Sequence, residues 1–327
     1  MKTIGIFPAS GGLGESTYTH LLRLVRADTV ILISRHPDKT PHEHIQAGVQ
    51  TRQADYTQSP AELEAAFTGI DVLFLISYPS HQHELRTKLQ LPAIDAAHRA
   101  GVSHLIYSSL AFANSPDGHP SNTSVAEVMG AHLDSEAHLA SLATSSPSTF
   151  TYTVIREGLY SESTPIYTAF FNPRTSKDNE ILIPHDGGGR GVSWVKRDEL
   201  GEATARIIAR CVNNSEGFAA RGWVNGRVVL MGPREWSLGE TVKVLGEVAG
   251  RSGEGGVRIR EVGADEYVRQ PQVLGVFGRE ELARTWATAF EAVKRGETGA
   301  VTRDLEEILG RRPEEFDVTV KGYWGGM

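Results

Sequence analysis

Short apolar runs and amphipathic stretches alternate along the first half of the chain. The apolar runs predict strands at residues 3–7, 29–34, 49–53, 71–76, 104–108 and 150–155. The amphipathic stretches predict helices at residues 13–25, 60–69, 85–99 and 127–142. Strands that alternate with helices of this length form a parallel, doubly wound sheet. The pattern therefore predicts an α/β fold of the Rossmann type.

The rhythm changes after Arg156, where the connections become less regular and richer in glycine. Helices are still predicted, at residues 198–211, 238–249 and 280–295. We therefore expect a Rossmann domain over residues 1–156 and a smaller, mixed α/β lobe for a substrate over residues 157–327. Some segments near residues 192–232 are expected to return to the main domain.

Composition narrows the class of protein. The 327 residues carry a formal net charge of −7, which argues against the basic surface of a nucleic-acid-binding protein. The single cysteine, Cys211, excludes an internal disulfide and is typical of a reducing compartment. No apolar run approaches the ~18 residues of a membrane-spanning helix, and the chain begins with a strand pattern rather than a targeting signal. We expect a soluble, cytoplasmic protein that acts as a monomer or a homodimer, without nucleic acid or membrane.

A glycine-rich turn follows the first predicted strand and leads directly into a helix. It reads Pro8-Ala9-Ser10-Gly11-Gly12-Leu13-Gly14, a Gly-x-x-Gly-x-x-Gly variant with proline at the first position. Glycines allow a dinucleotide diphosphate to approach the backbone, and the N–H groups at the helix start bind it. Strand, turn, helix and second strand follow in the order that the motif requires. The predicted contacts are Pro8, Ser10, Gly11, Gly12, Leu13 and Gly14.

The end of the second predicted strand indicates which dinucleotide binds. NAD-binding proteins commonly place an acidic residue there for the ribose hydroxyls, whereas an arginine suits the 2′-phosphate of NADP. The chain has Arg35 at this point, with Lys39 near enough to help. A solvated loop arginine is the alternative. NADP(H) is therefore the predicted cofactor, and further contacts are expected where other strands end, at Asp55, Ser77 and Ser108.

With these residues in place, the chain resembles the NmrA-like family of atypical short-chain dehydrogenases/reductases over nearly its full length. The resemblance rests on an ordered set of motifs: residues 7–14, residues 71–77, Tyr107-Ser108-Ser109, His132-x-x-x-Glu136, residues 153–160, residues 194–200 and Leu309-Gly310-Arg311-Arg312-Pro313. It implies a Rossmann domain, a smaller carboxyl-terminal lobe and a substrate cleft between them.

The family contains NADPH-dependent quinone and enone reductases, reductases of plant phenylpropanoid metabolism, and regulators that bind the nucleotide without turnover. The resemblance therefore implies an NADPH-dependent oxidoreductase that reduces a small carbonyl, quinone or enone, as in specialised metabolism. Two alternatives stay open. One is a non-catalytic regulator that senses NADP(H), and the other is an isomerase or cyclase that retains its cofactor.

The residues for proton transfer depart from the usual pattern. Most short-chain dehydrogenases use a Tyr-x-x-x-Lys helix, but the corresponding helix here, residues 128–136, contains neither residue type. His132 is the leading candidate proton donor, because imidazole titrates near neutral pH; a structural hydrogen bond is the alternative. Ser109 and Tyr160 are the other candidate catalytic residues. Glu136 is expected to orient His132 or to hold the helix.

Aromatic residues of the second half are expected to form an apolar wall for a flat substrate, with core packing as the alternative. They are Phe170, Phe171 and Trp194. Two histidine pairs have ligand-like spacing, His42 with His44 and His81 with His83. No third ligand accompanies either pair, so the sequence predicts no metal site.

Overall fold

The computed structural model describes residues 1–115 and 119–325 of the chain. Two compact units divide it. The first consists of residues 1–109, 131–157 and 197–229, and the second of residues 110–130, 158–196 and 230–327 in so far as they are described. Each unit is thus assembled from stretches that are separated along the chain.

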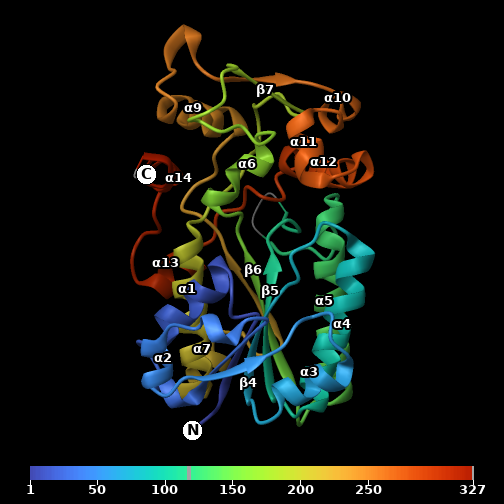
Figure 1. Cartoon of the computed structure of the whole chain (residues 1–327), viewed down its shortest axis with the longest axis vertical. Helices are drawn as coiled ribbons and strands as arrows, with labels where there is room; N and C mark the ends of the chain where they lie inside the picture. The colour runs from blue at the N-terminus through green and yellow to red at the C-terminus, as the bar shows by residue number, and fades with distance from the viewer. Residues whose placement is uncertain (116–118, 326–327) are drawn as a thin grey trace. The chain divides into compact units, whose positions relative to one another are not determined.

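A seven-stranded sheet forms the centre of the first unit (Figure 1). Its strands follow the order β3-β2-β1-β4-β5-β6-β8. The strands are β1 (Ile4–Phe7), β2 (Val30–Ser34), β3 (Gln50–Gln53), β4 (Val72–Ile76), β5 (His104–Leu110), β6 (Thr151–Glu157) and β8 (Gly226–Leu230). The central strand β1 pairs in parallel with β2 on one side and β4 on the other. Both faces of these strands are buried, which explains their continuous apolar runs. The predicted doubly wound α/β fold is confirmed.

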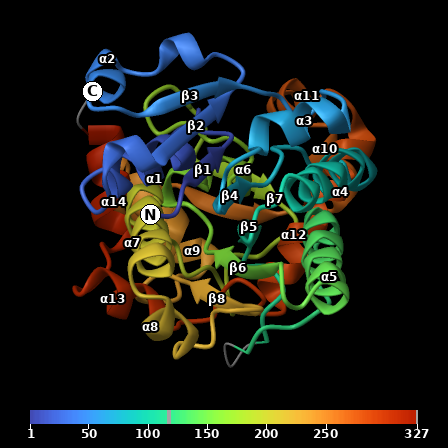
Figure 2. The same ribbon diagram turned by 90° about the horizontal axis from the view of Figure 1, so that it is seen from below.

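Helices cover both faces of this sheet, as the end-on view shows (Figure 2). The helices are α1 (Gly12–Leu21), α2 (His42–Gln46), α3 (Pro60–Phe67), α4 (His83–Arg99), α5 (Gly130–Ser145), α7 (Arg197–Asn213) and α8 (Ser215–Ala219). α3, α4 and α5 lie on one face, and α1 and α7 on the other. In the core under α3, the Phe7 ring centre lies 4.7 Å from that of Tyr56 and 5.4 Å from that of Phe67.

The second unit contains mainly helices and one short sheet. The helices are α6 (Thr164–Tyr167), α9 (Leu238–Val248), α10 (Ala264–Val268), α11 (Pro271–Phe277), α12 (Glu280–Lys294), α13 (Asp304–Leu309) and α14 (Phe316–Gly325). The sheet pairs β7 (Glu180–Ile183) in parallel with β9 (Arg258–Glu261). The sequence pattern did not predict this pair, because three of the four residues of β9 are charged. In the described chain, no helix is long and apolar enough to span a membrane.

Two helix starts are specified by local side-chain chemistry. In α3, Ser59 accepts a hydrogen bond from the backbone N–H of Glu62, whose carboxylate accepts one from the backbone N–H of Ser59. Ser237 and Glu240 form the same reciprocal pair at the start of α9. Such a capping box satisfies backbone donors that the first helical turn leaves open. Both capping boxes match the Ser-x-x-Glu pattern that stands at these positions of the sequence.

Candidate functional site

The glycine-rich turn lies in the first unit, between β1 and α1. Gly11 precedes α1 with a φ of 100°, in the left-handed region that favours glycine. Gly14 is buried against the turn, and a Cβ on it would lie 2.6 Å from the carbonyl oxygen of Pro8. Only a residue without a side chain therefore lets α1 start this close to the turn.

The start of α1 remains open towards solvent. Ser10, Gly11 and Gly12 are exposed, and Gly11 offers no side chain to cap the helix. The first backbone N–H groups of a helix have no partner within the helix, and they carry the positive end of its dipole. The strand order also reverses at β1. Open α/β sheets bind ligands at the carboxyl ends of the strands beside such a reversal. The turn thus has the backbone geometry that a nucleotide diphosphate requires.

Arg35 and Asp55 lie together beyond the ends of β2 and β3. Arg35 Nε is 3.4 Å from Asp55 Oδ2, and the Arg35 side chain is 71% exposed. Partial burial alone would raise the pKa of Asp55, but hydrogen bonds from Thr57 and the charge of Arg35 lower it below its usual value. Lys39 is exposed in the next turn. Two cations are therefore accessible where the sequence predicts the 2′-phosphate.

The two serines predicted as further cofactor contacts differ in accessibility. Ser77 directly follows β4 and is half-buried. Ser108 lies within β5, paired with Ile76 of β4, and is buried. Leu13 is also buried, inside the first turn of α1. Their contacts with a nucleotide remain predictions.

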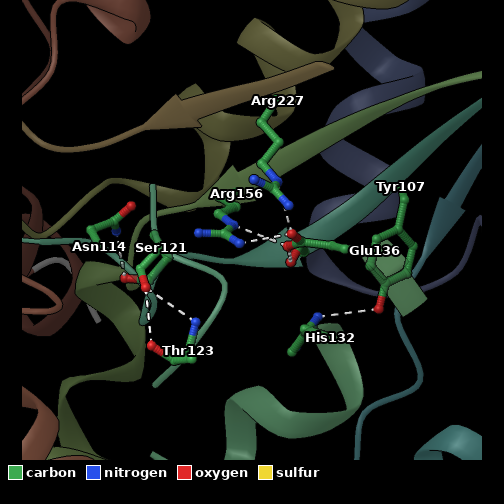
Figure 3. A network of polar contacts seen from close by, with 10 residues as sticks. Tyr107, Asn114, Ser121, Thr123, His132, Glu136, Arg156 and Arg227 are labelled. Atoms are coloured by element: carbon green, nitrogen blue, oxygen red, sulfur yellow. Dashed lines mark hydrogen bonds and ion pairs between the residues drawn. The ribbon is translucent and has the colours of Figure 1, made fainter. Parts of the chain in front are cut away.

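His132 lies in α5 within a buried polar network (Figure 3). Its Nε2 is 2.5 Å from Nη2 of Arg86, and its Nδ1 is 3.2 Å from the hydroxyl of Tyr107. Because a guanidinium only donates, Nε2 must be the acceptor, and the single proton of a neutral ring lies on Nδ1, directed at Tyr107. Burial lowers the pKa of His132 well below its usual value, and the charges of Arg86 and Arg156 lower it further. This geometry fits a structural hydrogen bond better than a proton donor.

Glu136 lies at the centre of a second buried network, with Arg156 and Arg227 beside it (Figure 3). The hydroxyl of Ser109 donates to Glu136 Oε1 at 2.6 Å. Arg156 donates to both carboxylate oxygens, at 3.0 and 2.7 Å, and Arg227 donates to Oε2 at 3.0 Å. The carboxylate thereby ties α5 to strands β5, β6 and β8. Ser109 is 2% exposed, so its hydroxyl serves this network rather than an open site.

The remaining predicted site residues lie in the second unit. Tyr160 is half-buried and precedes a short 3₁₀ turn, which Ser161 anchors by donating its N–H to the carbonyl of Val195. Phe170 and Phe171 line a cavity of about 500 Å³. Trp194 does not contribute to an apolar wall there, because it is fully buried and its ring packs on Phe316 at 5.4 Å.

Several residues of these networks were not identified from sequence. Arg86 and Gln90 lie on α4, and the amide of Gln90 donates to Tyr107 and Ser135. Arg197 begins α7, and its guanidinium lies against Gly12 of the glycine-rich turn. The sequence did contain a signal for Arg197. A cation in the first turn of a helix is unfavourable because of the helix dipole, so its presence there indicates a role other than stabilising the helix. Across the described ranges, no group of three His, Cys, Asp or Glu side chains is arranged to hold a metal ion.

The environment of His132 predicts a pH effect on stability. The unfolded chain binds a proton at His132 near pH 6.5, whereas the folded chain resists it until well below that pH. The free energy of unfolding should therefore fall by up to about 1.4 kcal/mol per pH unit as the pH drops from 6.5 to 5. Urea unfolding of the wild type and of His132→Gln, which can still accept from Arg86, measures this. Equal slopes for the two proteins over that range would contradict the assignment.

Comparisons with known proteins agree with this geometry. A family model described as NAD(P)H-binding matches residues 9–181. An NmrA-like family domain-containing oxidoreductase of Aspergillus flavus is 28% identical over 309 residues, which cover 93% of this chain and 89% of the relative. The solved triphenylmethane reductase of a Citrobacter species, complexed with NADP(H), is 26% identical with a TM-score of 0.72, over 98% of this chain and 99% of that one. An NADPH-dependent quinone oxidoreductase of Escherichia coli shares the fold, with a TM-score of 0.76 and 23% identity over 98% of this chain and 100% of the other.

Proposed function

Since this chain belongs to the NmrA-like family of NAD(P)H-binding proteins and is an NAD(P)H-dependent oxidoreductase, we propose that it uses NADPH to reduce a small quinone, enone or carbonyl compound. The observation that carries the cofactor choice is the end of β2, where Arg35 and Lys39 are exposed. A guanidinium binds a phosphate bidentately and stacks on a flat ring. The 2′-phosphate distinguishes NADPH from NADH, so these cations favour NADPH.

The residues of the glycine-rich turn fit the rest of the cofactor. Gly14 leaves no room for a Cβ, and exposed Ser10, Gly11 and Gly12 leave the backbone N–H groups accessible to the diphosphate. NADPH supplies a hydride when bound. The protein contributes binding and orientation, because the described catalytic candidates of the first unit, Ser109 and His132, are committed to buried hydrogen bonds. We assign the proton to water or to Tyr160.

The substrate class is proposed from the second unit. Its cavity of about 500 Å³ is lined by Phe170 and Phe171, by three other apolar residues and by seven polar or charged residues, among them Asp178, Glu180 and Gln270. Pockets of this size bury most of a small ligand, with apolar walls for affinity and a few polar groups for orientation. The related structures act on triphenylmethane dyes and on quinones. The two phenylalanine rings and the related structures support a flat, aromatic acceptor, whose polar groups the polar residues of the cavity can orient.

Fluorescence and absorbance of NADPH test the proposed function in one cuvette. We expect enhanced NADPH emission when the protein is added, and loss of absorbance only when a quinone or enone is then supplied. A Gly14→Ala protein serves as the control for consumption that does not need the cofactor site. Binding without consumption across the panel would overturn the quinone and enone assignment and favour a nucleotide sensor or a cofactor-retaining isomerase.

Arg35→Ala should raise the Kd for NADPH roughly 10- to 100-fold and leave that for NADH nearly unchanged. A charge-assisted hydrogen bond contributes about 1.5–3 kcal/mol. NADH has no 2′-phosphate and therefore does not make this hydrogen bond. Titration of each nucleotide by fluorescence gives both constants. Arg26→Ala is the matched control, because the side chain of that arginine is exposed and pairs locally with Asp28. An equal loss of affinity for NADPH and NADH would show that Arg35 does not bind the 2′-phosphate.

A further inference from the structure

The first residue of α7 lies directly over the glycine-rich turn. A Cβ built on Gly12 would come within 2.5 Å of both Cζ and Nε of Arg197. The guanidinium is therefore in contact with the backbone of the first residue of α1. The two residues belong to the same compact unit, although 185 positions separate them in sequence (197 less 12).

The packing of α7 on α1 holds Arg197 in this place. Asp198 accepts a hydrogen bond from Ser16 at 2.7 Å, and its Oδ1 lies 3.1 Å from Nε2 of His20. One turn further along α7, a Cβ on Gly201 would lie 2.1 Å from Oγ of Ser16. The glycine thus allows the two helices to touch, and the first turns of both helices lie side by side.

The charges of this arrangement favour an anion. The start of α1 and the start of α7 each carry the positive end of a helix dipole, where cations are unfavourable and anions favourable. Asp198 and Glu199 suit the start of α7, but the Arg197 guanidinium adds a full positive charge beside Gly12, the first residue of α1. A diphosphate in the turn accepts from both the N–H groups and the guanidinium, and so offsets the charge on each.

We propose that Arg197 binds the diphosphate of the cofactor, on the side facing the glycine-rich turn. This inference rests on the proposed cofactor site and adds a residue that the turn motif does not contain. It assigns separate phosphates to two arginines: Arg35 binds the 2′-phosphate and selects NADPH, whereas Arg197 binds the diphosphate that NADPH and NADH share. Arg197 thereby sets the affinity for both nucleotides and leaves the choice between them unchanged.

The test measures the Kd of three probes, NADPH, NADH and adenosine 2′-monophosphate, which carries a 2′-phosphate but no diphosphate. Arg197→Gln should weaken NADPH and NADH by the same factor, about tenfold or more, since a charge-assisted hydrogen bond is lost in both. Its affinity for adenosine 2′-monophosphate should stay unchanged. Arg35→Ala should show the reverse selectivity, with NADPH and the monophosphate weakened and NADH spared. Arg206→Gln is the matched control, because Arg206 lies on the same helix and pairs with Glu202 four residues away.

Each outcome separates this inference from the proposed function. If the wild type binds neither nucleotide, the cofactor site itself is wrong. If the wild type binds both and Arg197→Gln binds them equally well, only the role of Arg197 is wrong. A loss confined to NADPH would move Arg197 to the 2′-phosphate, and tighter binding by the variant would show that the guanidinium competes with the cofactor. Thermal unfolding without nucleotide checks that Arg197→Gln and Arg206→Gln are equally folded.

Discussion

Replacing Glu136 by glutamine should lower the free energy of unfolding by about 3–5 kcal/mol. The carboxylate is 2% exposed and its partner Arg156 is fully buried, at 2.7 Å. The substitution keeps the shape of the side chain but leaves the charge of Arg156 without its carboxylate in a low dielectric. Arg227 and Ser109 also lose a charged acceptor. Urea unfolding monitored by circular dichroism measures the change.

A surface pair of the same type provides the control. Glu64 and Arg99 lie 2.9 Å apart, with side chains 40% and 46% exposed. Solvent screens such a pair, so Glu64→Gln should cost only about 0.2–1 kcal/mol. Equal costs for Glu136→Gln and Glu64→Gln would show that burial does not set the strength of the Glu136 network.

The second large expected effect is on the affinity for the cofactor. Gly14→Ala should weaken NADPH binding about a hundredfold, or about 2.7 kcal/mol. The new methyl group would meet the carbonyl oxygens of Pro8 and Ala9 at 2.6 and 2.8 Å. These are backbone atoms, so the turn and the start of α1 must move apart. The N–H groups at the start of α1 are then no longer directed at the diphosphate. Fluorescence titration with NADPH measures the loss.

Gly275→Ala is the matched control, because Gly275 also lies in a helix, α11, and a Cβ there meets nothing within 4 Å. Alanine favours a helix more than glycine does, so this variant should bind NADPH like the wild type. Retention of wild-type affinity by Gly14→Ala would mean that the turn tolerates a side chain and does not enclose the diphosphate closely.

The predictable parts of the site depend on residues that are close in sequence. The glycine-rich turn is specified by the conformation of Gly11 and the closeness of Gly14 to Pro8, which are local properties. The capping boxes at Ser59 and Ser237 are local as well. Such features leave a readable pattern, because the residues that form them stand at fixed offsets.

The protonation state of His132 could not be predicted from the sequence. Its place on a helix of the Rossmann domain was predicted, but its protonation depends on Arg86, which lies 46 residues away on another helix. No periodicity indicates which arginine will face which imidazole. Arg197 illustrates the same limit, since its contact with Gly12 requires the packing of two helices distant in sequence.

The division of the first unit into three stretches of chain affects how the protein is made. Ribosomes release the amino-terminal part first, and domains tend to fold as they emerge. Until residues 226–230 appear, strand β6 forms the outer edge of the sheet with its backbone groups unpaired, a surface that invites association with other chains. Release of β8 pairs β6 and leaves the shorter β8 as the outer strand, while release of α7 brings Arg197 to the turn. Pairing of β6 and competence for the cofactor should therefore arise late in synthesis and almost together.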